Sequence, residues 1–279
     1  AYLVLRAIDR AVELGDDDGP DARDGLRFQV ASVAKFVGEL PKVGYVEANH
    51  LVGIANVLTD FARDGERRLR INLLAYSWYL EQAGHLDEAL DVVAVSHDHY
   101  DHMDKETIKF FAGKNINFYF SRGNKQYLEK WGINTSFITE MDWGDSVMVG
   151  GDIVVTAAPA RHFSGRGIFN RNTTLWSSFV IKGPKHNIFF GADSGWFPGF
   201  KEVGDTFGPF DLTMLEIGAY GKYWPDIHMG PDHASNAHVA LKGQLMMPIH
   251  WCTFNLSTHA WYETIDRFLQ YAKENNIGL

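Results

Sequence analysis

The sequence of 279 residues predicts an α/β fold, and three features of the chain indicate it. A run of apolar, mostly β-branched residues at 91–96 predicts a buried strand, and residues 104–111 have the character of a helix start. Further apolar runs at 153–159, 186–190 and 244–249 each lead to a histidine or an aspartate. Because α/β proteins build their sites at the carboxyl ends of strands, the same pattern predicts where the functional site lies.

The first strand leads into the string SHDHYDHMD, which places His97, His99, Asp101 and His102 within six positions. Side chains this polar are not buried together without a common partner. Imidazole and carboxylate suit zinc or a similar divalent ion. The alternative is a solvated, histidine-rich loop, against which the apolar strand just before it argues. Asp104 is expected to cap the following helix, whose acidic first turn suits the helix dipole.

Three more candidate ligands follow later strands. His162 comes just after the strand at 153–159, although strand-end histidines are common and His162 alone is weak evidence. Asp193 lies in FFGADSGW, where Gly191 and Gly195 are expected to let the backbone bend sharply. Its two oxygens can touch two metals at once, or it can form an Asx-turn with local amides. His250 ends the last of these strands.

Together with the HxHxDH string, these segments resemble the metallo-β-lactamase superfamily. The string APARHFSGRG, continuing to FNRNTTLW, is similar to the branch that contains N-acyl-phosphatidylethanolamine-hydrolysing phospholipase D and its bacterial relatives. The strings FFGADSGW and PIHWCTF resemble the family's later motifs. The resemblance implies a four-layer αβ/βα sandwich with the metal site at one edge of its two sheets. It extends over residues 88–274, within a single domain of residues 1–279.

The resemblance also implies two metal ions and a ligand set. His97, His99 and His162 would hold one ion, Asp101, His102 and His250 would hold the other, and Asp193 would bridge them together with a water. Two divalent cations, zinc or alternatively iron or manganese, would ionise that water to a hydroxide nucleophile. Asp101 would orient the hydroxide and shuttle its proton.

Further along, the pattern IGAY, then Trp, then HMGP resembles the same branch, in which a histidine here contacts the substrate phosphate or the leaving oxygen. His228 is therefore a candidate transition-state stabiliser or general acid; the alternative is a loop histidine without a role. Cys252 is either a thiol near the metal or a small buried hydrophobe. Aromatic residues in these loops, such as Trp196 and Tyr223, either line an apolar pocket or anchor the loops.

Residues 1–87 depart from the family pattern. Helical spacing at 3–14, 30–40 and 69–90 predicts a helix-rich N-terminal third where the family opens with strands. The departure leaves the candidate ligands intact. It puts the substrate pocket and an oligomer interface in doubt.

Composition limits the classes of partner and the cellular compartments that are expected for this chain. A net charge of −9 argues against nucleic acid as a partner, although two metal ions would still let the site accept an acidic substrate. One cysteine excludes a disulfide framework within the chain, and neither a signal pattern nor a run of about 18 apolar residues is found. These features favour a cytoplasmic protein. A homo-oligomer and peripheral contact with a membrane are left open.

The sequence thus predicts a dinuclear metal-dependent hydrolase acting on a phosphodiester, such as an N-acyl phospholipid headgroup. A lactonase acting on a phosphorylated sugar is an alternative for the same site. A metal-binding module without turnover is a third interpretation, because the altered N-terminal third can spoil the substrate pocket.

Overall fold

The computed structural model describes residues 71–73, 92–150, 152–251, 254, 256–260 and 262–278 of the chain. Most of the 1–87 segment and Cys252 lie outside these residues. The helices expected at 3–14 and 30–40 therefore stay predictions, as does any role of that cysteine. Among the residues that are described, no helix has the length and apolar character needed to cross a membrane.

The first sheet is four-stranded and parallel, in the order β1-β2-β3-β4. Its strands are β1 (Ile71–Leu73), β2 (Val92–Val95), β3 (Asn117–Ser121) and β4 (Ile138–Met141). β1 falls within 69–90, where helical spacing predicted a helix, and that prediction is wrong for Ile71–Leu73. The three residues are too few to show a strand period of their own. They are extended because parallel pairing with β2 satisfies their backbone groups.

The second sheet is six-stranded, in the order β10-β9-β8-β7-β6-β5. Its strands are β5 (Ser146–Gly150), β6 (Ile153–Ala158), β7 (Ser178–Lys182), β8 (Asn187–Phe190), β9 (Phe210–Glu216) and β10 (Gly243–Ile249). β8, β9 and β10 are parallel, whereas β5 to β8 pair antiparallel in succession. The predicted strands at 153–159, 186–190 and 244–249 are confirmed as β6, β8 and β10. Consequently β6, β8, β9 and β10 all end at the same edge of the sheet.

An apolar core fills the space between the two sheets. Successive side chains of a strand point to opposite faces, and β2 shows this alternation clearly. Val92 and Ala94 face the second sheet, where they join side chains of β6, β8 and β9, while Val93 and Val95 face the helices outside the first sheet. The all-apolar sequence of β2 is explained because both of its faces are covered.

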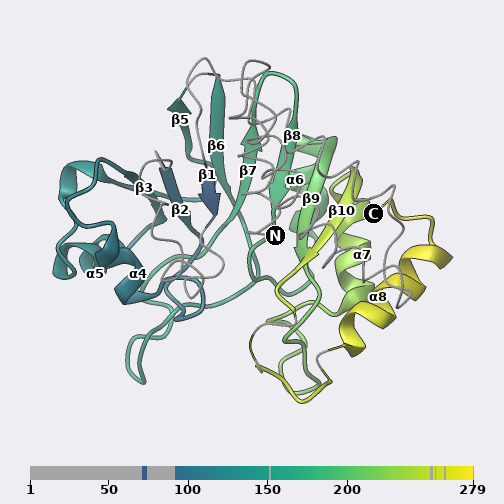
Figure 1. Ribbon diagram of the computed structural model, residues 1–279. Helices are drawn as coiled ribbons and strands as arrows, with labels where there is room; N and C mark the ends of the chain where they lie inside the picture. The colour runs from purple at the N-terminus through teal and green to yellow at the C-terminus, as the bar shows by residue number, and fades with distance from the viewer. Residues whose placement is uncertain are drawn as a thin grey trace, which may run out of the picture.

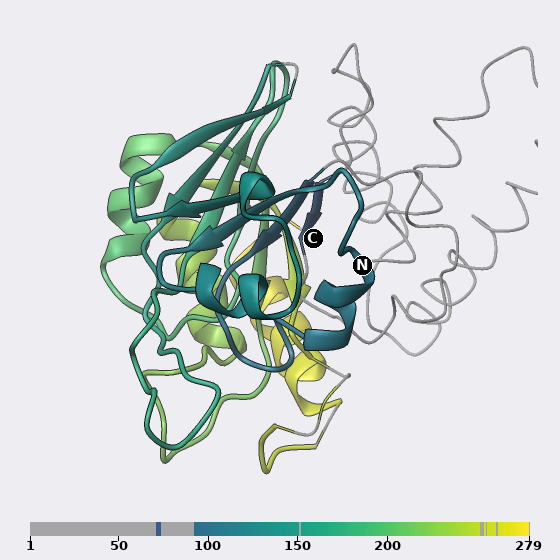
Figure 2. The same cartoon turned by 90° about the vertical axis from the view of Figure 1, so that its left-hand side faces the viewer.

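Helices cover the outer faces of both sheets (Figure 1). α4 (Lys105–Phe110) and α5 (Lys125–Lys130) pack on the first sheet, and Figure 2 shows the molecule from their side. α6 (Gly199–Phe207), α7 (Pro231–Ala240) and α8 (Glu263–Glu274) pack on the second. The order helix, sheet, sheet, helix is the predicted αβ/βα sandwich, and the fold class is confirmed.

Asp104 caps α4, as predicted. Its Oδ2 accepts hydrogen bonds from the backbone N–H of Thr107 at 2.8 Å and from the Thr107 hydroxyl at 2.9 Å. The cap satisfies amide groups that the first helical turn leaves without a partner. It also fixes the point at which the histidine-rich loop after β2 ends.

Close packing of α6 against α7 at Gly204 gives a first prediction. A Cβ at this position would lie 2.3 Å from the carbonyl oxygen of Ala240 and 2.8 Å from the Cα of Leu241. Alanine in place of glycine usually stabilises a helix by about 1 kcal/mol. For Gly204→Ala we expect the opposite, a loss of roughly 1–3 kcal/mol, because backbone atoms cannot move aside without separating the helices.

Thermal unfolding measures this effect. Glu202→Ala changes an exposed side chain of the same helix and serves as the control, with a much smaller expected shift. An unfolding temperature of Gly204→Ala equal to or above that of the unaltered chain would contradict the close approach.

Candidate metal centre

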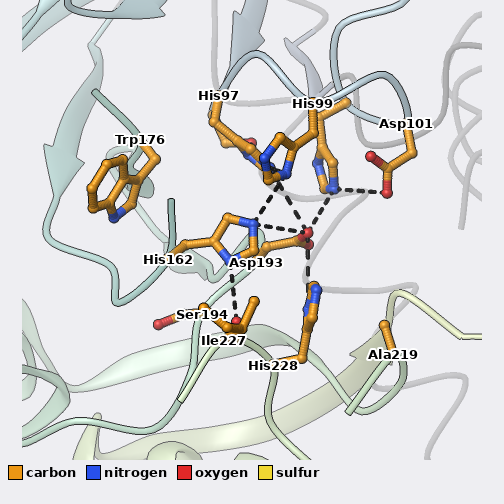
Figure 3. A network of polar contacts seen from close by, with 12 residues as sticks. His97, His99, Asp101, His162, Trp176, Asp193, Ser194, Ala219, Ile227 and His228 are labelled. Atoms are coloured by element: carbon orange, nitrogen blue, oxygen red, sulfur yellow. Dashed lines mark hydrogen bonds and ion pairs between the residues drawn. The ribbon is translucent and has the colours of Figure 1, made fainter. Parts of the chain in front are cut away.

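The structure brings all of the sequence-predicted site residues together at one edge of the sandwich. His97, His99, Asp101 and His102 lie on the loop that follows β2. The others lie beyond the carboxyl ends of strands in the second sheet: His162 after β6, Asp193 after β8, His228 between β9 and α7, and His250 after β10. Figure 3 shows His97 and His99 approaching Asp193 from one side and His228 from the other.

A first group consists of three imidazoles and Asp193. The Nδ1 atom of His99 lies 2.9 Å from Nε2 of His97 and 3.2 Å from Nε2 of His162. Oδ2 of Asp193 lies 3.8 Å from Nε2 of His97 and 3.7 Å from Nε2 of His162. These four ligand atoms all lie within 4.8 Å of one another.

Burial favours the neutral form of the imidazoles in this group. Burial lowers the pKa of His162 to about 3 and that of His99 to about 4, and burial together with the neighbouring His102 holds the pKa of His97 well below its usual range. Nδ1 of His162 lies 3.1 Å from the carbonyl oxygen of Ile227, to which only its N–H can donate. Its Nε2 therefore carries a lone pair. No single proton satisfies the three facing nitrogens, whereas a cation at their common point accepts a lone pair from each.

A second group combines Asp101, His102, Asp193 and His250. Nε2 of His102 lies 3.0 Å from Oδ2 of Asp193 and 3.4 Å from Oδ2 of Asp101. Nε2 of His250 lies 3.2 Å from Oδ1 of Asp193 and 3.4 Å from the same Asp101 oxygen. Two carboxylates thus converge on two imidazoles.

The carboxylates of this group demand a positive charge between them. Burial alone would lower the pKa of His102, but Asp193 and Asp101 raise it to about 10. Burial would raise the pKa values of both aspartates, but His102 and His250 hold them well below their usual range. A proton or a metal cation can supply the required charge. Imidazole with carboxylate is a donor set for divalent first-row ions, so the residues present fit such an ion.

Asp193 belongs to both groups, which is the arrangement expected of a bridging carboxylate. The Asx-turn alternative is not supported, because the amide of Gly195, two residues on, donates to the carbonyl oxygen of Arg161 at 2.7 Å. Oδ1 of Asp193 is buried and accepts no hydrogen bond from the described residues. Both carboxylate oxygens instead face imidazole nitrogens of the site.

The backbone turns sharply where two of these ligands are presented. Ala192 has φ +50° and His250 has φ +58°, left-handed values that cost an L-residue roughly 1–2 kcal/mol. The expectation that Gly191 and Gly195 supply the bend around Asp193 is therefore wrong, because the left-handed residue is Ala192. The glycines instead permit close approach: a Cβ at Gly195 would lie 2.0 Å from the carbonyl oxygen of Asp226.

Glu216 is a site residue that sequence reasoning missed. It ends β9, is fully buried, and places Oε2 2.7 Å from Nδ1 of His228. Burial alone would lower the pKa of His228, but Glu216 raises it above its usual value. The available signal was a single acidic residue closing an apolar strand. That signal is weak without a motif around it.

Asp98 and Arg166 also escaped the sequence analysis, and they hold the histidine-rich loop in place. Oδ1 of the fully buried Asp98 accepts a hydrogen bond from the amide of Gly165 at 2.7 Å. Nη1 of Arg166 donates to the carbonyl oxygens of Asp98 at 2.7 Å and Met103 at 2.6 Å. The loop carrying four candidate ligands is thereby tied to the loop that follows His162.

The chain matches the model of a known protein family. A family model described as a β-lactamase superfamily domain matches residues 56–251. The chain belongs to the metallo-β-lactamase superfamily. The family membership inferred from the sequence is therefore confirmed.

Relatives of this superfamily member show which branch it resembles. An uncharacterized protein of Mycobacterium tuberculosis is 42% identical over 193 residues, which are 68% of this chain and 51% of the relative. The N-acyl-phosphatidylethanolamine-hydrolyzing phospholipase D 1 of Caenorhabditis elegans is 34% identical over 184 residues, which are 62% of this chain and 52% of the relative. The chain thus spans about half the length of each of these two relatives.

Among solved structures, CmlA, a diiron β-hydroxylase from Streptomyces venezuelae, aligns with a TM-score of 0.54. The alignment covers 68% of this chain and 43% of that one at 15% identity. Such a likeness shows a shared fold and leaves the reaction to be argued from the site.

A third group joins Glu216 and His228 to Asp193 and His250. The first two groups predict separable metal binding. We expect His162→Ala to lose the ion of the first group and His250→Ala to lose that of the second, because each removes one nitrogen ligand. Metal analysis of protein purified without added ions, followed by Co²⁺ titration read by absorbance, measures both effects. The exposed His233 lies outside both groups, so His233→Ala should retain full uptake. Full uptake by both ligand variants would refute the assignment.

Proposed function

We propose that the chain is a dinuclear metal-dependent hydrolase that cleaves a phosphodiester, such as that of an N-acyl phospholipid headgroup. The observation that carries the proposal is the pair of His/Asp groups that share the buried Asp193. The resemblance to the Caenorhabditis elegans phospholipase D supports the substrate class. A small-molecule or lipid substrate suits this site better than a nucleic acid, given the net charge of −9.

The candidate ligands divide between two cations. His97, His99 and His162 would hold one, Asp101, His102 and His250 would hold the other, and Asp193 would contact both. Bound there, the cations would supply a water of lowered pKa and positive charge to neutralise the phosphate. The ligand set accepts zinc, iron or manganese, and we propose zinc, which suits hydrolysis without redox chemistry.

Asp101 and His228 are proposed to handle protons. Asp101 is the most exposed carboxylate of its group, and its Oδ2 touches both His102 and His250 at 3.4 Å, so it can orient a water and accept its proton. Nδ1 of His228 is engaged by Glu216, which leaves Nε2 for the substrate. The raised pKa of His228 favours the imidazolium, a donor to the leaving oxygen or to a charged phosphate oxygen.

Apolar side chains on the loops near the candidate ligands support a lipid substrate. Ile168 and Phe169 are 90% and 97% exposed, on the loop that begins beside His162. Tyr100, within the histidine-rich loop, and Tyr223, which precedes His228, are exposed as well. Exposed aromatic and aliphatic side chains that gather near a site indicate contact with an apolar partner.

Activity assays separate the proposal from its rivals. We expect the zinc-loaded protein to hydrolyse N-acyl-phosphatidylethanolamine in mixed micelles. His228→Ala should lower kcat by roughly 10²–10³-fold while retaining both metal ions, because a proton donor to the transition state is lost. His233→Ala is the matched control. Preferential turnover of a phosphorylated sugar lactone would favour the lactonase, and two bound ions without turnover of either substrate would favour a binding module.

The exposed loop gives a separate prediction for lipid presentation. Phe169→Gln should lower activity several-fold on substrate in phospholipid vesicles, because less apolar surface enters the bilayer. Activity on a soluble short-chain analogue should stay unchanged. Met148 on β5 is 69% exposed and lies away from the site loops, so Met148→Gln is the control. Equal losses on both forms of the substrate would argue against contact of this loop with lipid.

A further inference from the structure

Glu216 joins three segments of the site through one carboxylate. It is fully buried at the end of β9, and its hydrogen-bonding partners all belong to residues of the candidate site or their immediate neighbours. A buried carboxylate needs several donors to offset its lost hydration. Here the hydrogen-bond donors come from the turn after β8 and the loop before α7, and Nδ1 of His250, on the turn after β10, lies at an ion-pair distance of 3.4 Å.

One oxygen of Glu216 fixes backbone. Oε1 accepts a hydrogen bond from the amide N–H of Ser194 at 2.8 Å and from that of Met229 at 3.2 Å. Ser194 directly follows Asp193, and Met229 directly follows His228. The oxygen therefore holds the main chain next to two functional side chains.

The other oxygen of Glu216 fixes imidazoles. Oε2 lies 2.7 Å from Nδ1 of His228 and 3.4 Å from Nδ1 of His250. A carboxylate oxygen accepts hydrogen bonds, so it favours the Nδ1–H form of His228, and it would favour the same form of His250 when Nε2 of that ring binds a cation. Nε2 of His250 lies 3.2 Å from Oδ1 of Asp193 and 3.4 Å from Oδ2 of Asp101, so it is the nitrogen that faces the second group.

The two rings are also aligned with each other. The centroids of His228 and His250 are 5.4 Å apart, and the ring planes differ by 13°. Nδ1 of each ring lies within 3.4 Å of the same carboxylate oxygen, which agrees with this parallel arrangement. No carboxylate of the described residues makes a comparable contact with His97 or His99 from outside their group, so the effect is confined to the second group and His228.

We propose that Glu216 is a positioning residue that sets the tautomer and orientation of His250 toward the second cation and of His228 toward the substrate. This inference rests on the proposed function, because it assigns those tasks to the two histidines. Outer carboxylates that orient a ligand histidine commonly change metal affinity 10–100-fold when they are altered.

Glu216→Gln tests the proposal with an isosteric side chain, and Glu216→Asp retains the charge on a shorter arm. Co²⁺ titration should show the first equivalent unchanged and the second weakened by roughly 10–100-fold in Glu216→Gln, with partial recovery in Glu216→Asp. Glu140→Gln is the matched control, because Oε1 of Glu140 also accepts two backbone amides, those of Gly123 at 2.7 Å and Lys125 at 2.9 Å, and makes no contact with the described candidate ligands.

Imidazole ¹⁵N NMR of the metal-free protein provides a readout that stability alone does not move. In the unaltered chain His228 and His250 should both show a protonated Nδ1, and Glu216→Gln should shift His250 toward the other tautomer. The spectrum of the unaltered chain tests the proposal even where a variant does not fold.

Several outcomes overturn the inference. One is a His250 protonated at Nε2 alone in the unaltered chain. Another is equal weakening of both Co²⁺ equivalents in Glu216→Gln, and a third is an unaltered chain that takes up no second equivalent. Failure of the proposed function looks different: the second equivalent and its dependence on Glu216 would persist while N-acyl-phosphatidylethanolamine is not cleaved.

Discussion

The site depends on the charge balance around Asp193. This carboxylate is buried, and the imidazoles of His97, His102, His162 and His250 surround it within 3.8 Å. Burial lowers the pKa values of three imidazoles in the first group and so favours their neutral form, whereas the neighbouring imidazoles lower the pKa values of the two carboxylates in the second group and so favour their charged form. Uncompensated charge at this depth is costly, so the arrangement is stable only with positive charge among the carboxylates. The proposed pair of divalent cations would meet that demand and would also accept the converging lone pairs.

The backbone beside these ligands adopts conformations that raise the free energy of the folded chain. Ala192 and His250 adopt left-handed φ values, and Gly195 passes so close to Asp226 that no side chain fits there. Strain of this kind persists where the neighbouring contacts over-determine it, and it gathers at functional sites. Its location at His250 and directly before Asp193 agrees with a site shaped by its chemistry.

Much of the fold and site could be predicted from sequence, for identifiable reasons. The strands were visible because β2, β6, β8 and β10 are apolar on both faces, and each leads to a polar residue. The candidate ligands from His97 to His102 lie within six consecutive residues, so the sequence alone is enough to identify this cluster. Glu216 was missed because its partners come from segments that only the folded chain brings together. β1 was missed because a strand of three residues depends on its neighbour, and the bend at Ala192 depends on packing that no local pattern records.

Each group of candidate ligands draws on both halves of the sandwich. His97, His99, Asp101 and His102 belong to the edge of the first sheet, whereas His162, Asp193 and His250 belong to the second. An occupied site would therefore connect the two sheets through the bound ions. The free energy of metal binding would then stabilise the packing of one sheet against the other. Neither half alone could complete either ligand set. Removal of the metal by a chelator should therefore weaken the packing between the two sheets before it disrupts the hydrogen bonding within either sheet.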